Sequence, residues 1–153
     1  MRLPVSLAVA ALLFLAPAAR AQLQHFDAST LDIDTSGGTR HFTIELAISP
    51  AQQEQGLMYR RSLAPEAGML FVFPDVRTAT FWMKNTLIPL DMLFIAADGH
   101  VADIHELAVP LSEVNINSKV PVKAVLELNG GTVSRLGIKN GDLVHQATFG
   151  TAG

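Results

Sequence analysis

Alternating apolar and polar residues give the clearest structural signal near the start of the chain. Apolar side chains occupy every second position between residues 42 and 48, with more polar side chains between them. A period of two predicts a strand with one buried face and one solvated face. The same alternation at residues 31–34 comes just before the turn sequence Ser36-Gly37-Gly38, so the two segments are predicted to form a β-hairpin.

Later apolar runs predict further strands. Residues 69–73 are apolar at every position, as expected for a strand that is covered on both sides, and Pro74 follows them. Asp98-Gly99 is a typical hairpin turn between two neighbouring runs, which are predicted to be antiparallel. The other predicted strands are residues 78–83, 90–95, 101–106, 122–128 and 142–149.

The helical signals are short. Ser49-Pro50 has the residue types favoured at an N-cap and at the first helical position, so a helix is predicted to run from there toward Met58. The turn sequence at residues 129–131 precedes one predicted helical turn that ends at Gly137. Residues 107–121 are polar and contain prolines, which predicts a long loop.

Many short strands with closely spaced turns favour one all-β architecture. We expect a single small antiparallel β-barrel or sandwich with one or two short helices, rather than a parallel α/β sheet. The predicted domain spans residues 28–149. Residues 22–27 form a lead-in to it, and residues 150–153 form a C-terminal tail.

The first 21 residues have the pattern of a cleavable signal peptide. Arg2 supplies a positive charge, residues 3–16 are mostly apolar, and Ala19-Arg20-Ala21 places small residues where a signal peptidase recognises them. Cleavage is predicted before Gln22. A membrane anchor is the alternative, but the run is shorter than the ~20 residues that a bilayer span needs. The protein is therefore predicted to be exported, either periplasmic or secreted.

Charge and cysteine content limit the partners of the mature protein. Loss of Arg2 and Arg20 with the signal peptide leaves nine basic and fourteen acidic residues, a net charge of −5. This balance argues against nucleic acid as a partner. The chain has no cysteine and therefore no disulfide. No apolar run long enough to span a membrane follows residue 21, so no stable membrane insertion is expected after cleavage.

Five segments of the chain share their sequence with one known family. They are Gly56-Leu57-Met58, Gly68-Met69-Leu70-Phe71-Val72-Phe73, Phe81-Trp82-Met83-Lys84-Asn85-Thr86, Pro89-Leu90-Asp91-Met92-Leu93-Phe94-Ile95 and Val125-Leu126-Glu127-Leu128-Asn129-Gly130-Gly131. In this order they resemble the DUF192 family, also called UPF0127. The match extends from about Thr43 to Val144, and residues 137–142 fit the family's ending. The resemblance implies an all-β, barrel-like domain that is often exported in bacteria, and it implies no particular reaction.

One region concentrates groups that are suited to ligand binding. The segment from Thr80 to Asp91 holds the only tryptophan, a lysine, an amide and a carboxylate around a bend, and binding clefts combine such polar and large apolar groups. The alternative interpretation is ordinary packing with ordinary turn residues. The residues predicted to line a ligand cleft are Trp82, Lys84, Asn85, Asp91, Glu127 and Asn129.

Asp91 and Glu127 each lie in or beside a mostly apolar strand, where a carboxylate is either paired or functional. Two interpretations stay open. In the first, Lys84, Arg60 or Arg61 neutralises one carboxylate, and a polar cleft forms beside it. In the second, the carboxylates form buried ion pairs or cap backbone groups, and they only fix the turns.

Other chemistries have weaker support. Asp91 and Glu127 would form an acid/base pair for hydrolysis only at a separation of about 5 to 9.5 Å. Asp103 and His105 alternate onto one face of a strand, but two ligands without a known spacing do not predict a metal site. The sequence has no cysteine, no Gly-x-Ser-x-Gly motif and no glycine-rich phosphate loop, so neither a catalytic nucleophile nor a cofactor is predicted.

The leading functional hypothesis is a non-catalytic binding module for a small polar ligand, a sugar-like group or a peptide. One alternative is a hydrolase that uses Asp91 and Glu127, and another is a structural or assembly partner in the cell envelope. An enzyme pair requires one carboxyl with a raised pKa, whereas a binding cleft requires both carboxyls to be ionised or paired. An assembly partner would expose a contiguous apolar patch.

Overall fold

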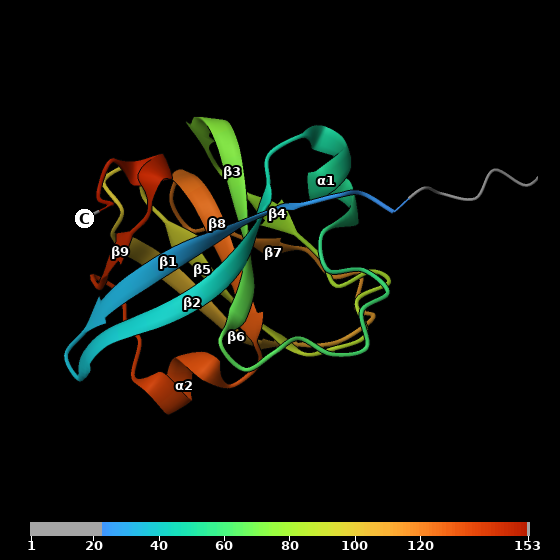
Figure 1. Cartoon of the computed structure of the whole chain (residues 1–153). Helices are drawn as coiled ribbons and strands as arrows, with labels where there is room; N and C mark the ends of the chain where they lie inside the picture. Colours follow the sequence, from blue (N-terminus) through green and yellow to red (C-terminus); the bar gives the residue numbers. More distant parts are fainter. Residues whose placement is uncertain (1–22, 153) are drawn as a thin grey trace, which may run out of the picture.

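The secondary structure is mostly β within residues 23–152, the part of the chain that this computed structural model describes (Figure 1). The strands are β1 (Asp27–Thr35), β2 (Gly38–Ala47), β3 (Ala67–Arg77), β4 (Thr80–Phe81), β5 (Leu90–Ile95), β6 (Val101–Ala108), β7 (Ile116–Asn117), β8 (Val122–Asn129) and β9 (Leu143–His145). The helical segments are α1 (Pro50–Gln55), α2 (Thr132–Leu136) and the 3₁₀ helix η1 (Ala147–Phe149). The predicted all-β class with short helices is confirmed.

The predicted signal peptide, residues 1–21, lies outside the described residues. Among the residues that are described, no helix has the length and hydrophobicity that crossing a membrane requires. The described chain begins just before β1, where the Gln24 backbone N–H donates to the Gln55 side chain at 2.7 Å. The lead-in therefore contacts the C-terminal end of α1.

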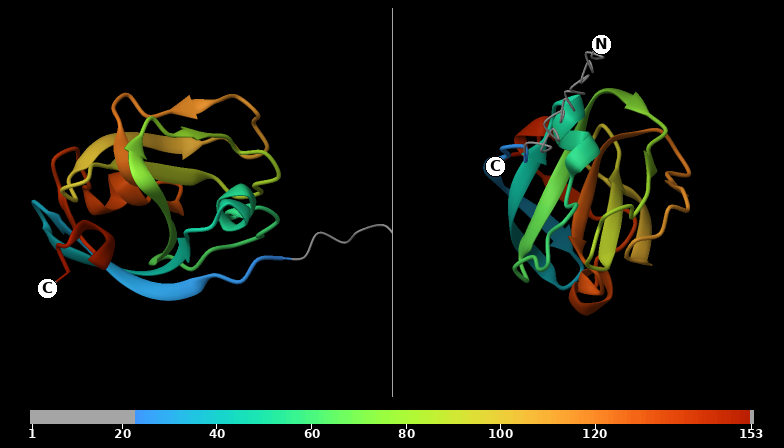
Figure 2. Two further views of the ribbon diagram at one scale, coloured as in Figure 1. Left: turned by 90° about the horizontal axis from the view of Figure 1, so that it is seen from above. Right: turned by 90° about the vertical axis from the view of Figure 1, so that its right-hand side faces the viewer.

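Most strands belong to one curled sheet. Its order in the described chain is β6-β5-β8-β3-β2-β1-β9, and β4 pairs with β7 in a separate small sheet. Figure 2 shows the large sheet curling from the β1–β2 hairpin round to β5 and β6, with α1 and α2 at opposite ends. Two backbone bonds of 2.9 Å join the outer strands, from Val101 N–H to the Asp142 carbonyl and from Val144 N–H to the Gly99 carbonyl. The sheet is thus a partly closed barrel.

The predicted hairpin is formed by β1 and β2, which pair antiparallel along their whole length. Phe42 and Ile44 are buried, as the alternation predicts. Ile48 does not continue this face and is 55% exposed. The reason is that β2 ends at Ala47 and the chain then turns into α1.

The helix α1 begins where the sequence indicates. Ser49 Oγ accepts the Gln52 N–H at 3.2 Å, and Gln52 Oε1 accepts the Ser49 N–H at 2.9 Å, which is a capping box. The helix ends before Met58, because Gly56 has a φ of 47°. As a crossover, α1 allows β2 and β3 to pair in parallel, an arrangement that the sequence did not predict.

Two hydrophobic clusters bury the central strands β3, β5 and β8 on both faces. The inner cluster, enclosed by the curl, includes Leu70 and Leu126. The outer cluster, covered by the turn after α1 and by the segments with β4 and β7, includes Met69 and Val125. Successive residues of a strand alternate between the two clusters, which explains why these strands have continuous apolar runs.

Several predicted strands differ in length from the observed ones. The strand expected at residues 78–83 is limited to β4, and β3 continues past Pro74 through a register shift. The last strand is only β9, because Gln146 Oε1 accepts the Thr148 N–H at 2.6 Å and starts η1. The loop expected at residues 107–121 contains β7.

Candidate functional site

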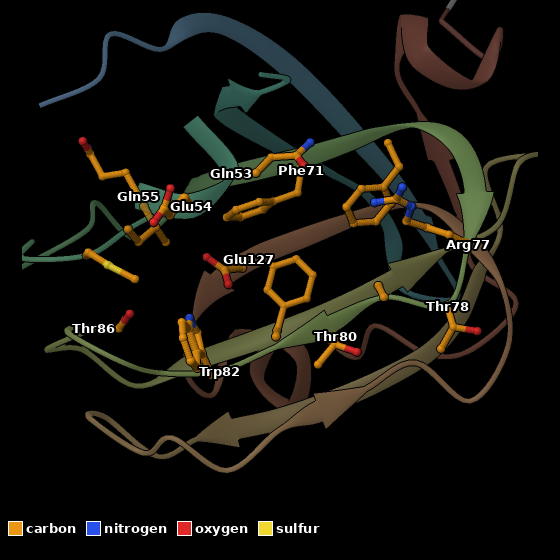
Figure 3. Close-up of a pocket in the computed structure, with 16 residues that line it drawn as sticks. Gln53, Glu54, Gln55, Phe71, Arg77, Thr78, Thr80, Trp82, Thr86 and Glu127 are labelled. Carbon is orange, nitrogen blue, oxygen red and sulfur yellow. The ribbon is translucent and has the colours of Figure 1, made fainter. Parts of the chain in front are cut away.

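A cleft of about 360 Å³ opens on the outer face of the sheet, between α1 and the segment that contains β4 (Figure 3). Strands β3 and β8 form its floor. The turn after α1 and the residues next to β4 form its sides. Its aromatic lining residues are Phe71, Phe73, Phe81 and Trp82.

The α1 wall of this cleft is held by Gln53. Its side-chain amide donates to the Ala47 carbonyl at 3.1 Å and to the Val72 carbonyl at 2.8 Å. Gly56 then allows the chain to approach the floor closely, since a Cβ at this position would lie 3.0 Å from the Phe71 ring. Helix α1 has no buried residue although it lies over the sheet. A polar helix in this place therefore borders a space rather than a packed core.

Glu127 lies at the floor of the cleft and is 4% exposed. Its side chain points into the space between Phe71 and Trp82 (Figure 3). Among the described residues, Arg40 Nε is the only fully buried side-chain nitrogen or oxygen without a hydrogen bond. The Glu127 carboxyl has no hydrogen-bond partner in that part of the chain, so its oxygens keep some exposure to the cleft. Burial raises the pKa of the Glu127 carboxyl to about 8.

Trp82 forms the exposed rim of the cleft, with 44% of its surface accessible. The Lys84 ammonium lies over its ring, 5.1 Å from the centroid, a distance typical of a cation–π contact. Behind the rim, the rings of Phe71 and Phe81 meet edge to face with centroids 5.0 Å apart. Trp82 and Glu127 thus line one cleft, and Lys84 lies beside it.

Asn85 connects two loops at one end of the cleft. Its carbonyl accepts the Tyr59 N–H at 2.9 Å, and its side-chain amide donates to the Tyr59 hydroxyl at 3.0 Å. Both residues have positive φ values, 55° for Asn85 and 65° for Tyr59, a conformation that Asn tolerates better than most residues. The bonds hold the cleft-lining residues Met58 and Thr86 in place. Asn85 therefore positions the cleft without lining it.

Asp91 does not lie in the cleft, so this part of the predicted site is wrong. Asp91 pairs with Leu128 while the next residue, Met92, pairs with Glu127. Successive residues of a strand point to opposite faces, so Asp91 points to the inner face and Glu127 to the outer face.

On the inner face, Asp91 satisfies backbone groups. Its Oδ1 accepts the N–H groups of Leu107 at 2.9 Å and Gly131 at 3.0 Å, and its Oδ2 accepts that of Val133 at 2.8 Å. Helix α2 has no capping side chain at its own N-cap, Gly131. Asp91 supplies this cap from β5, which is the backbone-capping role that the second interpretation describes.

The Asp91–Glu127 acid/base pair is excluded by the same geometry, because the sheet separates the two carboxyls. Glu127 meets the criterion of a raised pKa, but its predicted partner faces the other way. The hydrolase hypothesis in that form is wrong.

The remaining predicted residues have structural contacts. Asn129 does not line the cleft, and its amide donates to the carbonyls of Leu63 at 3.1 Å and Ala64 at 2.9 Å. Arg60 forms a bidentate pair with Glu45. Among the described residues, the predicted ion pair of Lys84, Arg60 or Arg61 with Asp91 or Glu127 is therefore not formed.

A second hollow of about 440 Å³ lies beside β6 and includes Asp103 and His105. Its buried carboxylate is already paired, since Lys119 Nζ lies 2.8 Å from Asp103 Oδ1. The described residues contain no group of three or more His, Cys, Asp or Glu side chains placed to hold a metal ion. The cleft with the unpaired carboxyl is thus the stronger candidate.

Comparison with known proteins identifies the family. The profile of DUF192, described as an uncharacterised ACR, matches residues 32–146. The chain belongs to the DUF192 family. The predicted resemblance is thereby confirmed, and both walls of the cleft lie within the matched region.

Two solved structures are similar to this DUF192 chain. One, from Sinorhizobium meliloti 1021, is named as a candidate transcription regulator; it is 52% identical, with a TM-score of 0.80, and the match covers 83% of this chain and 99% of that one. The other, a protein of unknown function from Novosphingobium aromaticivorans DSM 12444, is 41% identical, with a TM-score of 0.79 and coverage of 87% and 94%. Comparison with curated proteins found no match.

The sequence missed the α1 side of this DUF192 site. Gln53, Glu54 and the two phenylalanines Phe71 and Phe81 line the cleft but were not predicted to do so. One signal was present: residues 52–55 are all polar and offer no apolar face for packing. What the assembled site offers is an open carboxyl between aromatic rings, which suits the binding of one small molecule.

Proposed function

We propose that this protein is a non-catalytic binding protein for a small polar ligand, held in the cleft between Trp82 and Glu127. The observation that carries the proposal is the Glu127 carboxyl, which is buried, lacks a partner among the described residues and opens to the cleft. An unpaired buried polar group costs folding free energy, so it is kept where a ligand can satisfy it.

The size and lining of the cleft support a small ligand. About 360 Å³ lies within the range of small-molecule sites, and aromatic walls with a few polar groups are typical of them. Trp82 at the rim offers a flat face against which a ligand can stack. A sugar-like ring or one residue of a peptide fits this description.

We also propose that the protein acts after export. The support is the N-terminal sequence, which has the charge, apolar run and small residues of a signal peptide. A role in transcription, as named for the Sinorhizobium relative, does not suit a chain with a formal net charge of −3, because DNA-binding proteins are typically basic.

A thermal-shift screen tests this proposal. The purified chain is heated with sugars, short peptides, metal ions and cell-envelope fragments, and a ligand of the folded state raises Tm. Because the chain has a single tryptophan, its fluorescence reports directly on the cleft. We expect any ligand that raises Tm to change Trp82 fluorescence as well, and to be recovered chemically unaltered after incubation.

Two matched variants locate the binding. Trp82→Ala removes the rim, whereas Leu87→Ala removes a side chain that is equally exposed, at 44%, and does not line the cleft. We expect the first change to abolish the Tm shift and the second to preserve it. A ligand that still binds Trp82→Ala, or that is converted to a product, would refute the proposal.

An assembly partner is the second candidate. The end of β6 and the loop after it expose the large apolar side chains of Leu107, Val109, Leu111 and Val114. Exposed apolar patches are typical of protein-binding surfaces. Sedimentation of the chain and of the double variant Val109→Ser/Val114→Ser tests this candidate. A complex that the double variant loses would favour assembly, and a monomer in both cases would favour the ligand cleft.

A further inference from the structure

We infer that the ligand of the cleft is a small organic cation, whose ammonium group lies against the Glu127 carboxyl and the surrounding aromatic rings. This inference rests on the proposed function and names the chemical class of its ligand. Its support comes from the pairing of the buried acids, the aromatic walls and the arrangement of charges around the cleft.

The described chain has three buried acidic residues, Asp91, Asp103 and Glu127. Asp91 accepts three backbone N–H groups, and Asp103 is paired with Lys119. Glu127 alone has neither kind of partner among the described residues. A positively charged donor is the strongest partner that a ligand can bring to a desolvated carboxylate.

The aromatic walls of the cleft also favour a cation. Aromatic faces attract cations, and the chain's own cations already use two rings at the ends of the cleft. Arg77 lies 5.6 Å from the Phe73 centroid, and Lys84 lies 5.1 Å from the Trp82 centroid. Phe71 and Phe81 line the cleft beside Glu127 without a cation over them among the described residues. The cleft-facing surfaces of these two rings are therefore the aromatic surfaces that an ammonium group from outside can contact.

Three elements place charged groups at the cleft. Glu54 faces it from α1, Arg77 from the end of β3, and Glu127 from β8. In Figure 3, Glu54, Glu127 and Trp82 lie toward one end of the cleft and Arg77 lies at the other. Lys84 lies on the rim with its ammonium over Trp82. A cation next to Glu127 is therefore attracted by the Glu54 carboxylate and, once Glu127 has lost its proton, by the Glu127 carboxylate as well.

Binding of a cation has a proton signature. In the free protein, burial raises the pKa of Glu127 to about 8, so the carboxyl is mostly protonated at pH 7. A bound ammonium group favours the ionised carboxylate and lowers that pKa. Each binding event at pH 7 should therefore release close to one proton, and affinity should increase as the pH rises toward 8.

The experiment uses three probes of equal chain length: butylammonium, butanol and butyrate, at matched ionic strength. Binding to the full chain is followed by Trp82 fluorescence and Tm. We expect only butylammonium to bind, and isothermal titration in two buffers of different ionisation enthalpy to show proton release. The proton count is measured on the unaltered protein and so does not depend on a variant folding.

Glu127→Gln keeps the shape of the side chain and removes its charge. Glu113→Gln is the matched control, an exposed residue that lines neither hollow. We expect Glu127→Gln to weaken butylammonium binding at least tenfold and to remove the proton release, and Glu113→Gln to change neither.

Three results would overturn the inference: equal binding of butanol, preferred binding of butyrate, or undiminished butylammonium binding by Glu127→Gln. Failure of this inference can be distinguished from failure of the proposed function. If a sugar or peptide binds in a way that Trp82→Ala abolishes while butylammonium does not bind, the cleft is a binding site and only the cation class is wrong. If no probe of any class binds at Trp82, both proposals fail.

Discussion

Two carboxylates on neighbouring strands have opposite surroundings. Asp91 on β5 has both oxygens engaged by backbone N–H groups that start α2. Glu127 on β8 is one register position away, on the other face, and meets aromatic side chains and the open cleft. At the scale of single residues, one carboxyl caps backbone groups of the fold and the other has no partner among the described residues.

The role of Asp91 can be tested by Asp91→Asn. The amide replaces one accepting oxygen by a donor, which repels at least one backbone N–H. We expect a loss of roughly 2 kcal/mol or more in the free energy of unfolding, because hydrogen bonds to a charged group contribute about 1.5–3 kcal/mol each. Urea unfolding measures this loss, with the exposed Asp75→Asn as control.

The same variant separates structure from binding. Because Asp91 lies on the inner face, ligand binding by folded Asp91→Asn should match that of the wild type. A loss of binding with unchanged stability would place Asp91 in the site after all and contradict the residue-level assignment.

At the scale of elements, the close packing of β3 on β8 brings Glu127 to the cleft. Gly68 is a point of close approach in this pair, since a Cβ there would lie 2.7 Å from the Glu127 carbonyl oxygen and 2.8 Å from a Leu128 methyl group. Its φ is not positive, so space rather than backbone conformation requires a glycine.

Gly68→Ala should therefore push β8 away from β3. We expect a destabilisation of about 1–3 kcal/mol, the usual cost of overpacking a core. Gly37→Ala is the control, because the nearest atom to a Cβ there is the end of the flexible Arg40 side chain, at 2.9 Å. Thermal unfolding of the Gly68→Ala and Gly37→Ala variants measures this difference. Equally small losses of stability in both variants would contradict the packing argument.

The elements differ in how far the sequence determines them. Strand β5 and the start of α1 have local signals, an apolar run and a capping sequence, and the prediction was right for both. The parallel pairing of β2 with β3 depends on where a crossover places the chain, and no local pattern encodes it.

The residues of the candidate site also differ in how far the sequence alone predicts them. The sequence identified Trp82 and Glu127 as cleft residues, because an indole and a carboxylate stand out in apolar segments. It wrongly added Asp91, since the face to which a residue points depends on strand register. It missed Glu54 and Phe71, because their approach to Glu127 follows from tertiary packing.

At the scale of the whole molecule, Glu127 links stability to pH. Its pKa is about 8 in the folded chain, against an ordinary value of 4.5. Between these values the folded state holds a proton that the unfolded state has lost. The stability that Glu127 contributes is thus fully present below pH 4.5 and is lost as the pH rises through 8, by roughly 1.4 kcal/mol per pH unit at most.

Urea unfolding at pH 5, 6, 7 and 8 checks this dependence. His145, whose pKa is raised mainly by its hydrogen bond with Asp34, changes stability in the same direction, but this pair lies at the surface and its effect is screened by solvent. The comparison is therefore made with Glu127→Gln, which should be more stable than the wild type at pH 8 and should lose most of the slope. Glu113→Gln should keep the wild-type slope.

Glu127 at the floor of the cleft is a buried carboxyl that has no partner among the described residues and that a ligand can satisfy. The most direct measurement is an NMR titration of the protein labelled with ¹³C at glutamate Cδ, with the Glu127 signal assigned by its absence in Glu127→Gln. We expect an apparent pKa near 8 in the free protein that falls when butylammonium is added. A Glu127 pKa near 4.5 in the free protein would mean that the carboxyl is already solvated or paired, and it would contradict the account.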